Sequence, residues 1–362
     1  MRVMAMRYIA LKIFASTPPT DKIKAPDNKL LLFITLFLVK TTKIFWKIRN
    51  FLYNFNVKPK FKLNFNKFIV ALAPMAGVTD FAFRKICADF GADMVVTEMI
   101  SLKAIEHTSA RSQKMLREES SALHVCQVFF HEPDVANLIG DKMFDAFDII
   151  DLNCGCPAPK IVKNHDGSAM MKDLENSKQV ISSLVEHSNK PVSVKFRLGI
   201  DGVENYIEFA KMCEDCGVSF LTLHARTREQ GYAGIVDKDA YKRLVESVNI
   251  PVFWSGDIAS KEDVEYAKSI GCAGVMIGRA AMGNPEIFAK IKGIKAPYSK
   301  KQAIIKHLEL LKTYFHFERT LVAYFKKHLM WYVKSMDNAT ATKVKILQFT
   351  TLKEIEDLIA TL

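Results

Sequence analysis

The feature of this sequence that most limits its possible folds is a series of eight short apolar runs, rich in β-branched residues, that alternate with longer stretches of helical period. The runs are Ile69 to Ala73, Met94 to Thr97, His124 to Phe129, Asp148 to Leu152, Val192 to Phe196, Phe220 to His224, Val252 to Ser255 and Gly274 to Ile277. Apolar strands separated by helices indicate a parallel sheet that is covered on both faces. Eight repeats favour closure into a barrel over an open, doubly wound sheet.

Helical patterns follow these runs and then take over the end of the chain. Expected helices include Asp80 to Phe90, Ser177 to His187, Tyr206 to Cys216, Lys261 to Ile270 and Pro285 to Lys292. From Tyr298 to Leu362 the strand pattern stops, and apolar residues recur with helical spacing. We therefore predict an α/β fold, a (βα)8 TIM barrel at residues 68–292 followed by a small helical domain at residues 298–362.

The first 67 residues differ from the rest, being rich in Phe, Lys, Ile and Asn and lacking glycine. Their longest apolar run, Leu30 to Val39, is too short for a transmembrane helix, which needs ~20 residues. A membrane-surface helix through Ile44, Trp46 and Phe51 is one alternative. We expect instead a poorly ordered extension, or upstream sequence read from a start codon placed too early, although no Met lies between Met6 and Met75.

The positive charge of the chain is unevenly distributed. The formal net charge is +12, but residues 1–67 hold 14 Lys and Arg against 2 acidic residues, residues 68–289 hold 23 against 31, and residues 290–362 hold 14 against 6. The predicted barrel is therefore acidic and the helical tail is basic. A basic module beside an acidic catalytic domain favours a macromolecular substrate that carries phosphates; the alternative is a solvated helical face.

Composition and cysteine usage indicate an ordinary protein of a reducing compartment. Hydrophobic residues make up 49% and charged residues 25% of the chain, which argues against disorder and against several membrane spans. Seven cysteines, an odd number without a spaced disulfide framework, suit a reducing compartment. We expect a cytoplasmic monomer without stable membrane association.

Polar residues and glycines gather at the ends of the apolar runs. In (βα)8 enzymes the active site lies at the C-terminal ends of the strands. The segments there are Pro74 to Gly77, Thr97 to Met99, Gln127, Asn153 to Pro157, Lys195 to Arg197, His224 to Arg228, Ser255 to Asp257, and Gly278 with Arg279. Eight such segments at one rim predict a single active site.

Two glycines at this rim suggest a bound phosphate. Gly256 and Gly278 directly follow the seventh and eighth runs, and their N–H groups with Arg279 would form a phosphate cup. Tight turns are the alternative explanation for both glycines. Lys195 would hold negative charge on a ring such as a reduced flavin. A structural ion pair or Schiff-base chemistry are the alternatives for that lysine.

Cys156 is the cysteine most available to a substrate. It lies in a loop between glycine and proline, whereas Cys87, Cys213 and Cys272 fall in helix or strand patterns typical of core residues. Cys154 with Cys156 could ligate a metal, but no His or Cys partners occur at supporting spacing, so we expect no metal site.

Together these motifs resemble the tRNA-dihydrouridine synthases, most closely their bacterial B-type branch. The matching segments are Ala73 to Asp80, Leu152 to Pro157, Val194 to Arg197, Leu223 to Thr227, Gly278 to Pro285 and, in the helical tail, Lys326 to Tyr332. The likeness runs from about Phe68 to the end of the chain, and residues 1–67 have no counterpart in it.

The resemblance implies a cofactor, a reductant and a substrate. It implies FMN held by Pro74, Met75, Ala76, Gln127, Lys195, His224, Gly256, Asp257, Gly278 and Arg279, with NADPH as reductant and a helical tail that helps to grip tRNA. Ser255, also counted among the cofactor-binding residues, stands where the family commonly has Asn; this departure permits a backbone contact with the cofactor but leaves a side-chain contact in doubt. Cys156 is the expected proton donor to C5 of uracil, and Asn153 and Arg226 would orient the base. The target uridine must be turned out of the tRNA.

Two rival functions remain open at this point. A flavin barrel that acts on a free pyrimidine-type small molecule would share the cofactor cup but would not need a basic tail. An RNA-binding protein that has kept the barrel and lost catalysis would need neither flavin nor Cys156.

Overall fold

The computed structural model describes residues 65–107, 115–117 and 121–362. The expectations for residues 1–67, including the membrane-surface helix through Ile44, Trp46 and Phe51, fall outside the described residues apart from the last three positions. Among the described residues, no helix is both long and apolar enough to cross a bilayer.

Eight parallel strands close into a barrel, which confirms the predicted fold class. The strands are β1 (Ile69–Leu72), β2 (Met94–Val96), β4 (Leu123–Phe129), β5 (Ile149–Cys154), β6 (Val192–Arg197), β9 (Phe220–His224), β10 (Val252–Ser255) and β11 (Gly274–Ile277). β1 pairs with both β11 and β2, and β2 pairs with β4, so the sheet has no open edge between its first and last strands. Each strand matches one of the predicted apolar runs to within two residues at either end.

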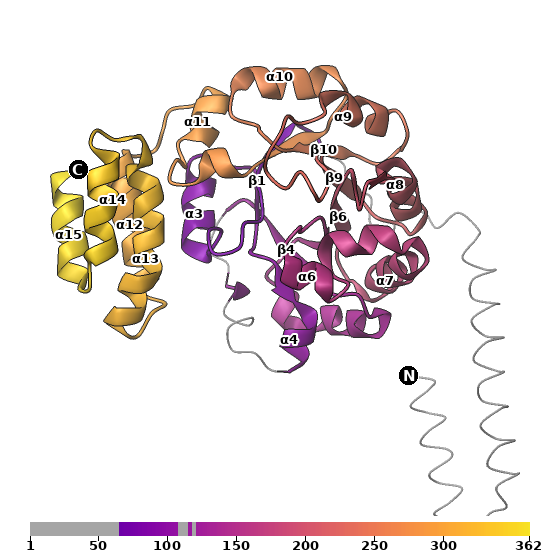
Figure 1. Ribbon diagram of the computed structural model, residues 1–362, viewed down its shortest axis with the longest axis horizontal. Coiled ribbons are helices and arrows are strands. Elements are labelled where there is room, and N and C mark those ends of the chain that lie inside the picture. The colour runs from indigo at the N-terminus through magenta and orange to yellow at the C-terminus, as the bar shows by residue number, and fades with distance from the viewer. Residues whose placement is uncertain (1–64, 108–114, 118–120) are drawn as a thin grey trace, which may run out of the picture. The chain divides into compact units, whose positions relative to one another are not determined.

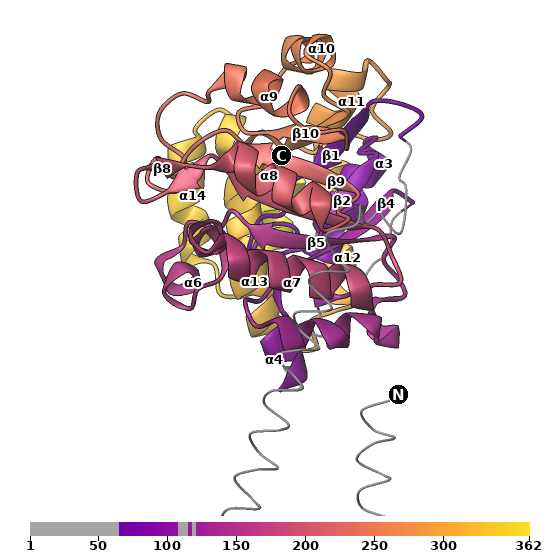
Figure 2. The ribbon, with the colours of Figure 1, turned by 90° about the vertical axis from the view of Figure 1, so that its right-hand side faces the viewer.

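Helices surround the barrel and bury the outward faces of its strands (Figures 1 and 2). The main ones are α3 (Phe81–Asp89), α7 (Leu174–His187), α8 (Tyr206–Asp215), α9 (Lys238–Val245), α10 (Lys261–Ser269) and α11 (Ile287–Lys292). After β4 the chain instead forms a 3-10 helix, η1 (Pro133–Gly140). Proline fixes its own backbone and is favoured in a first helical turn, so it sets the start of this segment.

Short elements fill the remaining loops and shape the rim of the barrel. They are β3 (Ile100–Ser101), α4 (Leu102–Glu106), η2 (Lys142–Phe144), α6 (Pro159–Lys163), η3 (Gly167–Lys172), β7 (Gly199–Ile200), β8 (Val203–Glu204) and η4 (Arg279–Ala281). Of these, α6 and η3 follow β5, and η3 brings the chain back to Cys156 through Gly167 and Ser168. The sequence patterns predicted none of these elements because each is too short to show a period.

The barrel interior changes character along its axis. One buried apolar cluster contains inward-facing strand residues such as Ile69, Val125 and Phe253, and the Phe65 ring lies 5.2 Å from that of Phe253. Toward the C-terminal ends of the strands the inward-facing residues become polar, as at Gln127 and Asp151. The apolar end therefore contributes packing, while the polar end is where chemistry can take place.

Four α-helices follow the barrel: α12 (Lys300–Lys312), α13 (Glu318–Tyr332), α14 (Ala339–Gln348) and α15 (Leu352–Thr361), with η5 (Val333–Ser335) between α13 and α14. They lie behind the barrel in Figure 2. Capping boxes start two of them, Ser299 with Gln302 at α12 and Thr351 with Glu354 at α15. Reciprocal side-chain bonds of this kind satisfy N–H groups that the first helical turn leaves unpaired. The helical tail predicted from residue 298 is thus present.

A buried polar cluster joins these helices to the barrel. Asp80 caps α3 by accepting from Phe83 N–H at 2.9 Å, and its carboxylate also lies 3.0 Å from His328 Nε2 and 3.5 Å from His307 Nε2. Tyr324 Oη–H donates to the same carboxylate at 3.2 Å. Burial alone would raise the pKa of Asp80, but the two histidines hold it well below its ordinary value. The cluster fixes α12 and α13 against α3, as in Figure 1.

Candidate active site

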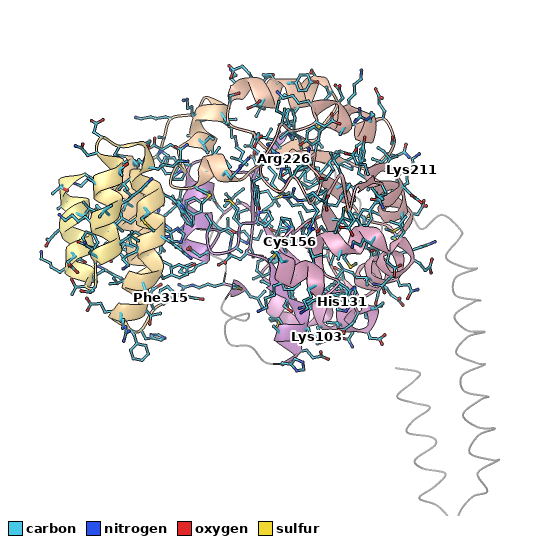
Figure 3. All side chains as sticks on the ribbon, viewed as in Figure 1. Lys103, His131, Cys156, Lys211, Arg226 and Phe315 are labelled. Atoms are coloured by element: carbon cyan, nitrogen blue, oxygen red, sulfur yellow. The ribbon has the colours of Figure 1, made fainter. Side chains whose placement is uncertain are left out.

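The structure brings most of the predicted site residues together at the C-terminal rim of the barrel. Hydrogen bonds link Gln127, Asp151 and Asn153 on the β4 and β5 side, and a second set links His224, Arg226, Asp257 and Arg279 on the β9 to β11 side. Pro74, Met75 and Ala76 follow β1 and are partly or fully exposed. Cys156 and Arg226 lie near the middle of the barrel in Figure 3.

A chain of hydrogen bonds runs from a buried carboxylate to the backbone of Cys156. Asp151 accepts from Ser193 Oγ–H at 2.6 Å and from the Gln127 side-chain amide at 2.8 Å. Gln127 in turn accepts from the Asn153 amide at 2.8 Å. The Asn153 oxygen accepts from the N–H groups of Gly155 at 3.1 Å and Cys156 at 2.9 Å. Each amide orientation is therefore fixed by its neighbour, and the chain positions the Cys156 loop.

The far side of the Cys156 loop is held by residues of η3. Ser168 donates to the Cys156 carbonyl through its N–H at 3.1 Å and through Oγ–H at 3.0 Å. Gly167 has φ +61, and a Cβ there would lie 2.9 Å from that carbonyl oxygen and 3.1 Å from the Cys156 Cβ. Only glycine permits this approach. The cysteine is thus held between Asn153 on one side and Ser168 on the other.

Cys156 is the only cysteine of the seven that is not buried, and all seven lie in the described part of the chain. Burial of its sulfur raises the pKa of the Cys156 thiol above the ordinary 9.0, against the opposing effects of a hydrogen bond from the Ala158 backbone and of the charges of Arg197 and Lys195. The thiol is therefore protonated at neutral pH. A neutral thiol within reach of solvent suits proton donation better than nucleophilic attack.

Lys195 places a positive charge inside the barrel mouth. Burial, with repulsion from Arg197, lowers the pKa of Lys195 from 10.5 to about 8, and the nearby Asp151 opposes the shift. Among the described residues, its ammonium group has no hydrogen-bond or ion-pair partner. A partly desolvated cation without a partner favours an anionic group at this place.

His224 lies among the cations of the rim. Burial first, then the charges of Lys195, Arg197, Arg226 and Arg279, lower the pKa of His224 from 6.5 to about 2. The ring is therefore neutral, and its Nε2 can accept from Arg226 Nη1–H, which lies 3.3 Å away. A neutral imidazole leaves the positive potential of this side to the arginines and the lysine.

Asp257 holds two arginines of the rim. Its two carboxylate oxygens accept from Arg226 and from Arg279, and its backbone adopts the left-handed conformation at φ +53. Arg226 also donates to the carbonyls of Ala233 at 2.9 Å and Gly234 at 2.7 Å. Arg226 is buried and committed to these contacts, so in this structure it supports the loop after β9. Its orientation of a substrate base stays a prediction.

The structure gives different reasons for the presence of glycine at the two rim positions, Gly256 and Gly278. At Gly256, φ is +116 and a Cβ would lie 2.7 Å from His224 Cδ2, so packing alone requires glycine. At Gly278 a Cβ would meet no atom closer than 3.7 Å, while the backbone, at φ −104 and ψ −102, lies outside the α and β regions. Within the described part of the chain, no hydrogen bond uses the N–H of Gly278 or Arg279. These two N–H groups are therefore the ones that an approaching anion would meet. The Ser255 carbonyl accepts a hydrogen bond from Tyr241 Oη–H at 2.6 Å.

Several positioning residues were not predicted from the sequence. Arg197 donates to the carbonyls of Gly155 and Thr227 and so ties the loops after β5 and β9 together. Tyr232, 59% exposed, has the guanidinium of Arg279 at 5.3 Å from its ring and that of Arg197 at 5.5 Å. Asp151 could have been noticed, because an acidic residue inside an otherwise apolar strand needs buried partners. Ser168 and Tyr232 show no signal before the loops are placed, whereas Arg197 already stood in a predicted rim segment without an assigned role.

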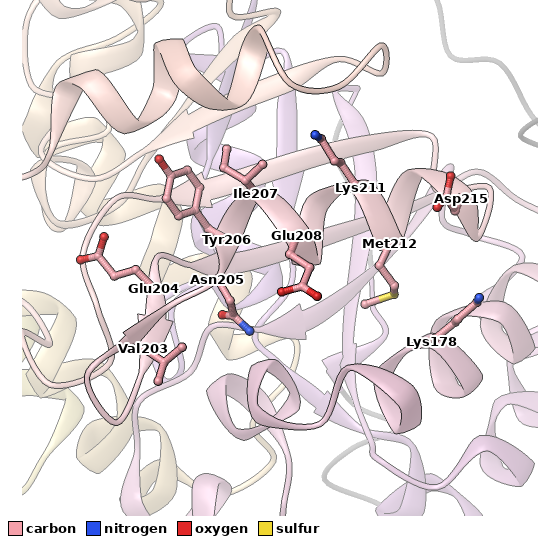
Figure 4. A pocket seen from close by; sticks show the side chains of 10 residues that line it. All are labelled: Lys178, Val203, Glu204, Asn205, Tyr206, Ile207, Glu208, Lys211, Met212 and Asp215. Atoms are coloured by element: carbon pink, nitrogen blue, oxygen red, sulfur yellow. The ribbon is translucent and has the colours of Figure 1, made fainter.

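An open pocket on another part of the barrel is separate from this site. It has a volume of about 750 Å³, lies along α8 and contains Lys178, Glu204, Lys211 and Asp215 (Figure 4). No predicted site residue lines it. Among the described residues, the one group of side chains with metal-ligand chemistry is the buried Asp80, His307 and His328 cluster. Its carboxylate already accepts from Phe83 N–H and Tyr324 Oη–H and lies 3.0 Å from His328 Nε2.

Comparison with known proteins gives a consistent result. The family described as dihydrouridine synthase (Dus) matches residues 71–361. The tRNA-dihydrouridine synthase B of Vibrio vulnificus is 36% identical over 288 residues, which cover 76% of this chain and 88% of that protein. A probable tRNA-dihydrouridine synthase of Rickettsia conorii is 35% identical over 311 residues, covering 78% of this chain and 93% of that protein. Among solved structures, a variant of NCR from Zymomonas mobilis has a TM-score of 0.47 at 15% identity and covers 64% of this chain and 88% of that chain, a likeness too distant to bear on function.

Proposed function

This chain belongs to the dihydrouridine synthase family, and from that premise we propose that it reduces specific uridines in tRNA to 5,6-dihydrouridine. The observation that carries the proposal is Cys156: a protonated, partly exposed thiol at the end of β5, facing a barrel mouth that is rich in cations. The reaction needs a proton donor beside a place for an anionic cofactor, and this rim supports both.

The residues of the rim fit FMN. The N–H groups of Gly278 and Arg279, unused within the described part of the chain, would bind a phosphate, and the Lys195 ammonium lies where negative charge on a flavin ring would be stabilised. Pro74, Met75 and Ala76 offer a partly exposed surface after β1 for the ring itself. Gln127, His224, Ser255, Gly256 and Asp257 complete the proposed set. When bound, FMN that NADPH has reduced would supply the hydride for C6 of uracil.

Cys156 would complete the reduction from the other face of the base. Addition of hydride at C6 leaves enolate-like charge toward C5 and O4 of the uracil, so a proton must reach C5. The Cys156 thiol donates that proton and leaves a thiolate, which the nearby charges of Arg197 and Lys195 stabilise. Asn153 fixes the cysteine through its backbone N–H. A positioned general acid of this kind contributes ~10²- to 10⁴-fold to a rate.

The substrate side of the proposal rests on charge and access. Residues 290–362 carry 14 Lys and Arg against 6 acidic residues, which suits contact with tRNA phosphates. Base-modifying enzymes must turn the target nucleotide out of the stack, and the rim of this barrel is where the turned-out uridine would enter. We further propose a cytoplasmic monomer without stable membrane association, built from a barrel at residues 68–292 and a tRNA-binding helical domain at residues 298–362.

The deciding experiment compares substrates. Purified protein with NADPH should form dihydrouridine in unmodified tRNA and leave free uracil almost unreduced. Equal reduction of free uracil would favour a flavin dehydrogenase of small pyrimidines. Absence of bound flavin, with unchanged dihydrouridine in the tRNA of a deletion strain, would favour an RNA-binding protein without catalysis. Mapping dihydrouridine in that strain would also identify the positions that are reduced.

A further inference from the structure

A cavity of about 380 Å³ lies where the first two strand ends of the barrel meet the C-terminal helices. Gly77 and Glu98, after β1 and β2, form its barrel side together with Phe81 of α3. Tyr314 and Phe315, after α12, and Tyr324 and Lys327 of α13 form its helical side. Phe315 lies on the side of the C-terminal helices nearer the barrel in Figure 3.

The two sides of this cavity are fixed against each other. The Asp80 carboxylate, which lines the cavity, accepts from Tyr324 Oη–H and lies 3.0 Å from His328 Nε2, both of α13. At the other end of α3, Asp89 accepts from Tyr298 Oη–H at 2.8 Å and from Lys306 Nζ at 2.7 Å. A ligand would therefore find the cavity already formed, which lowers the entropic cost of binding.

The walls combine aromatic rings with two acidic residues, Asp80 and Glu98, and two basic residues, Arg84 and Lys327. Ring contacts run from Phe81 to Tyr314 at 5.3 Å, from Tyr314 to Phe315 at 4.9 Å and from Phe315 to Tyr324 at 4.9 Å between centroids. The Lys327 ammonium lies 3.9 Å from the centre of the Tyr324 ring. Glu98 accepts from Gly77 N–H through one carboxylate oxygen, and within the described residues its other oxygen makes no hydrogen bond. Aromatic faces beside hydrogen-bonding groups are what proteins use to hold an unstacked base.

The position of the cavity indicates which base it would take. Its barrel side begins at Gly77, the residue after the exposed Ala76 of the proposed flavin site. The volume lies at the lower end of the ~300–1,000 Å³ typical of small-molecule sites, enough for one nucleotide and too small for a stem of tRNA. Turning a uridine out of a tRNA loop also unstacks its neighbours, whose faces then need new contacts.

We propose that this cavity binds the base of an unpaired tRNA nucleotide close in sequence to the uridine that is reduced, stacking it against Phe315 and Tyr324 beside Glu98 and Lys327. The proposal rests on the proposed function, since it requires tRNA as the substrate. In this proposal, the contact region between the barrel and the C-terminal helices helps to select which uridine of the tRNA is reduced.

The test combines a variant with altered substrates. Four altered tRNAs would be made, each lacking the base of one nucleotide: the first or second nucleotide before the reduced uridine, or the first or second after it. The rate of dihydrouridine formation in a single turnover would be measured for each. For one position, loss of the base should slow the unaltered protein by ~5- to 150-fold, the usual worth of stacking one base. With Phe315→Ala the same loss should change the rate less than about twofold, because the contact is already gone.

Phe317→Ala is the matched control. Phe317 lies two residues away, is 75% exposed and does not line the cavity, so this variant should respond to the missing base as the unaltered protein does. Reduction of bound flavin by NADPH without tRNA verifies that each variant is folded and loaded, and Tyr314→Leu provides a second alteration of the wall.

Two results would overturn the assignment. One is a Phe315→Ala protein that loses as much rate as the unaltered protein at all four positions. The other is a rise in the KM for NADPH, with an unchanged KM for tRNA, in Phe315→Ala or Tyr314→Leu. That result would indicate that the cavity binds the nicotinamide nucleotide instead. Failure of the unaltered protein to form dihydrouridine in any tRNA would instead reject the proposed function, and the base assignment with it.

Discussion

The two sides of the barrel mouth use polar side chains in opposite ways. On the β4 to β6 side, Ser193, Asp151, Gln127 and Asn153 form one continuous chain in which each member bonds the next. On the β9 to β11 side, Arg226 and Arg279 share the single carboxylate of Asp257, and the one histidine is neutral. The first side has its hydrogen bonds satisfied, whereas the second has an excess of positive charge.

This difference separates positioning from binding. A satisfied chain of hydrogen bonds resists movement, so it suits a residue such as Cys156 that must meet one atom of a substrate. An excess of positive charge in a partly desolvated site attracts an anion before any contact is made. Changes on the first side should therefore lower turnover, and changes on the second should lower cofactor affinity.

The largest effect is expected from removing the thiol itself. Cys156→Ala should lower dihydrouridine formation by ~10²- to 10⁴-fold, because no other group would deliver the proton to C5. Reduction of bound flavin by NADPH should continue at the normal rate, as measured by loss of flavin absorbance without tRNA. Cys272→Ala, a buried cysteine that lines neither site, is the control. Full turnover by Cys156→Ala would remove the proton-donor assignment.

Removing a charge on the opposite side should act on binding. Arg279→Met should weaken FMN affinity by ~10- to 150-fold, the usual worth of a hydrogen bond to a charged group, while bound flavin keeps its normal rate of reduction. Quenching of FMN fluorescence during titration measures the affinity. Arg243→Met provides the comparison, since Arg243 is an exposed arginine that pairs with Asp237 on the outer face. Equal affinities for both variants would show that the rim arginine does not contact the phosphate.

A smaller effect is expected at the start of the hydrogen-bond chain. Asp151→Asn leaves one acceptor oxygen for two donors, so Gln127 or Ser193 loses its partner and the Cys156 loop shifts. We expect kcat to fall ~10-fold, from the cost of one unsatisfied buried group, with KM for tRNA unchanged. Ser193→Ala removes a donor and keeps the carboxylate for Gln127, so its effect should be milder. A rise in KM at constant kcat would contradict a positioning role.

The same comparison shows what the sequence could predict. All eight strands and the rim residues were predictable, because apolar runs of strand length and the polar residues at their ends are local signals. Cys156 was predictable as the accessible cysteine because it lies in a loop, between Gly155 and Pro157. The closed barrel followed from the number of repeats.

Contacts between distant segments could not be predicted in this way. Nothing local to Ser168 indicates that it would hold the Cys156 carbonyl, and nothing local to Arg226 indicates that Ala233, Gly234 and Asp257 would occupy its donors. From the sequence, Gly256 and Gly278 were both expected to approach a phosphate, whereas packing against His224 explains the presence of glycine at position 256 only. Such differences depend on which loops meet at the rim, and that is set by the closed barrel as a whole.

The smallest effect expected concerns pH and Lys195, which lies between the two sides. Its pKa of about 8 means that the flavin-free protein loses this positive charge as pH rises through 8, so FMN affinity should fall about twofold between pH 7 and pH 8 and more steeply above. Protonated Lys195 attracts the anionic FMN more strongly than neutral Lys195 does, so the affinity for FMN must fall as the pH rises. Lys195→Arg keeps its charge over this range and should bind FMN with a flat profile. Lys195→Met should also be flat, but weaker at every pH. A profile for Lys195→Met that still falls through pH 8 would assign the titration to another group of the site.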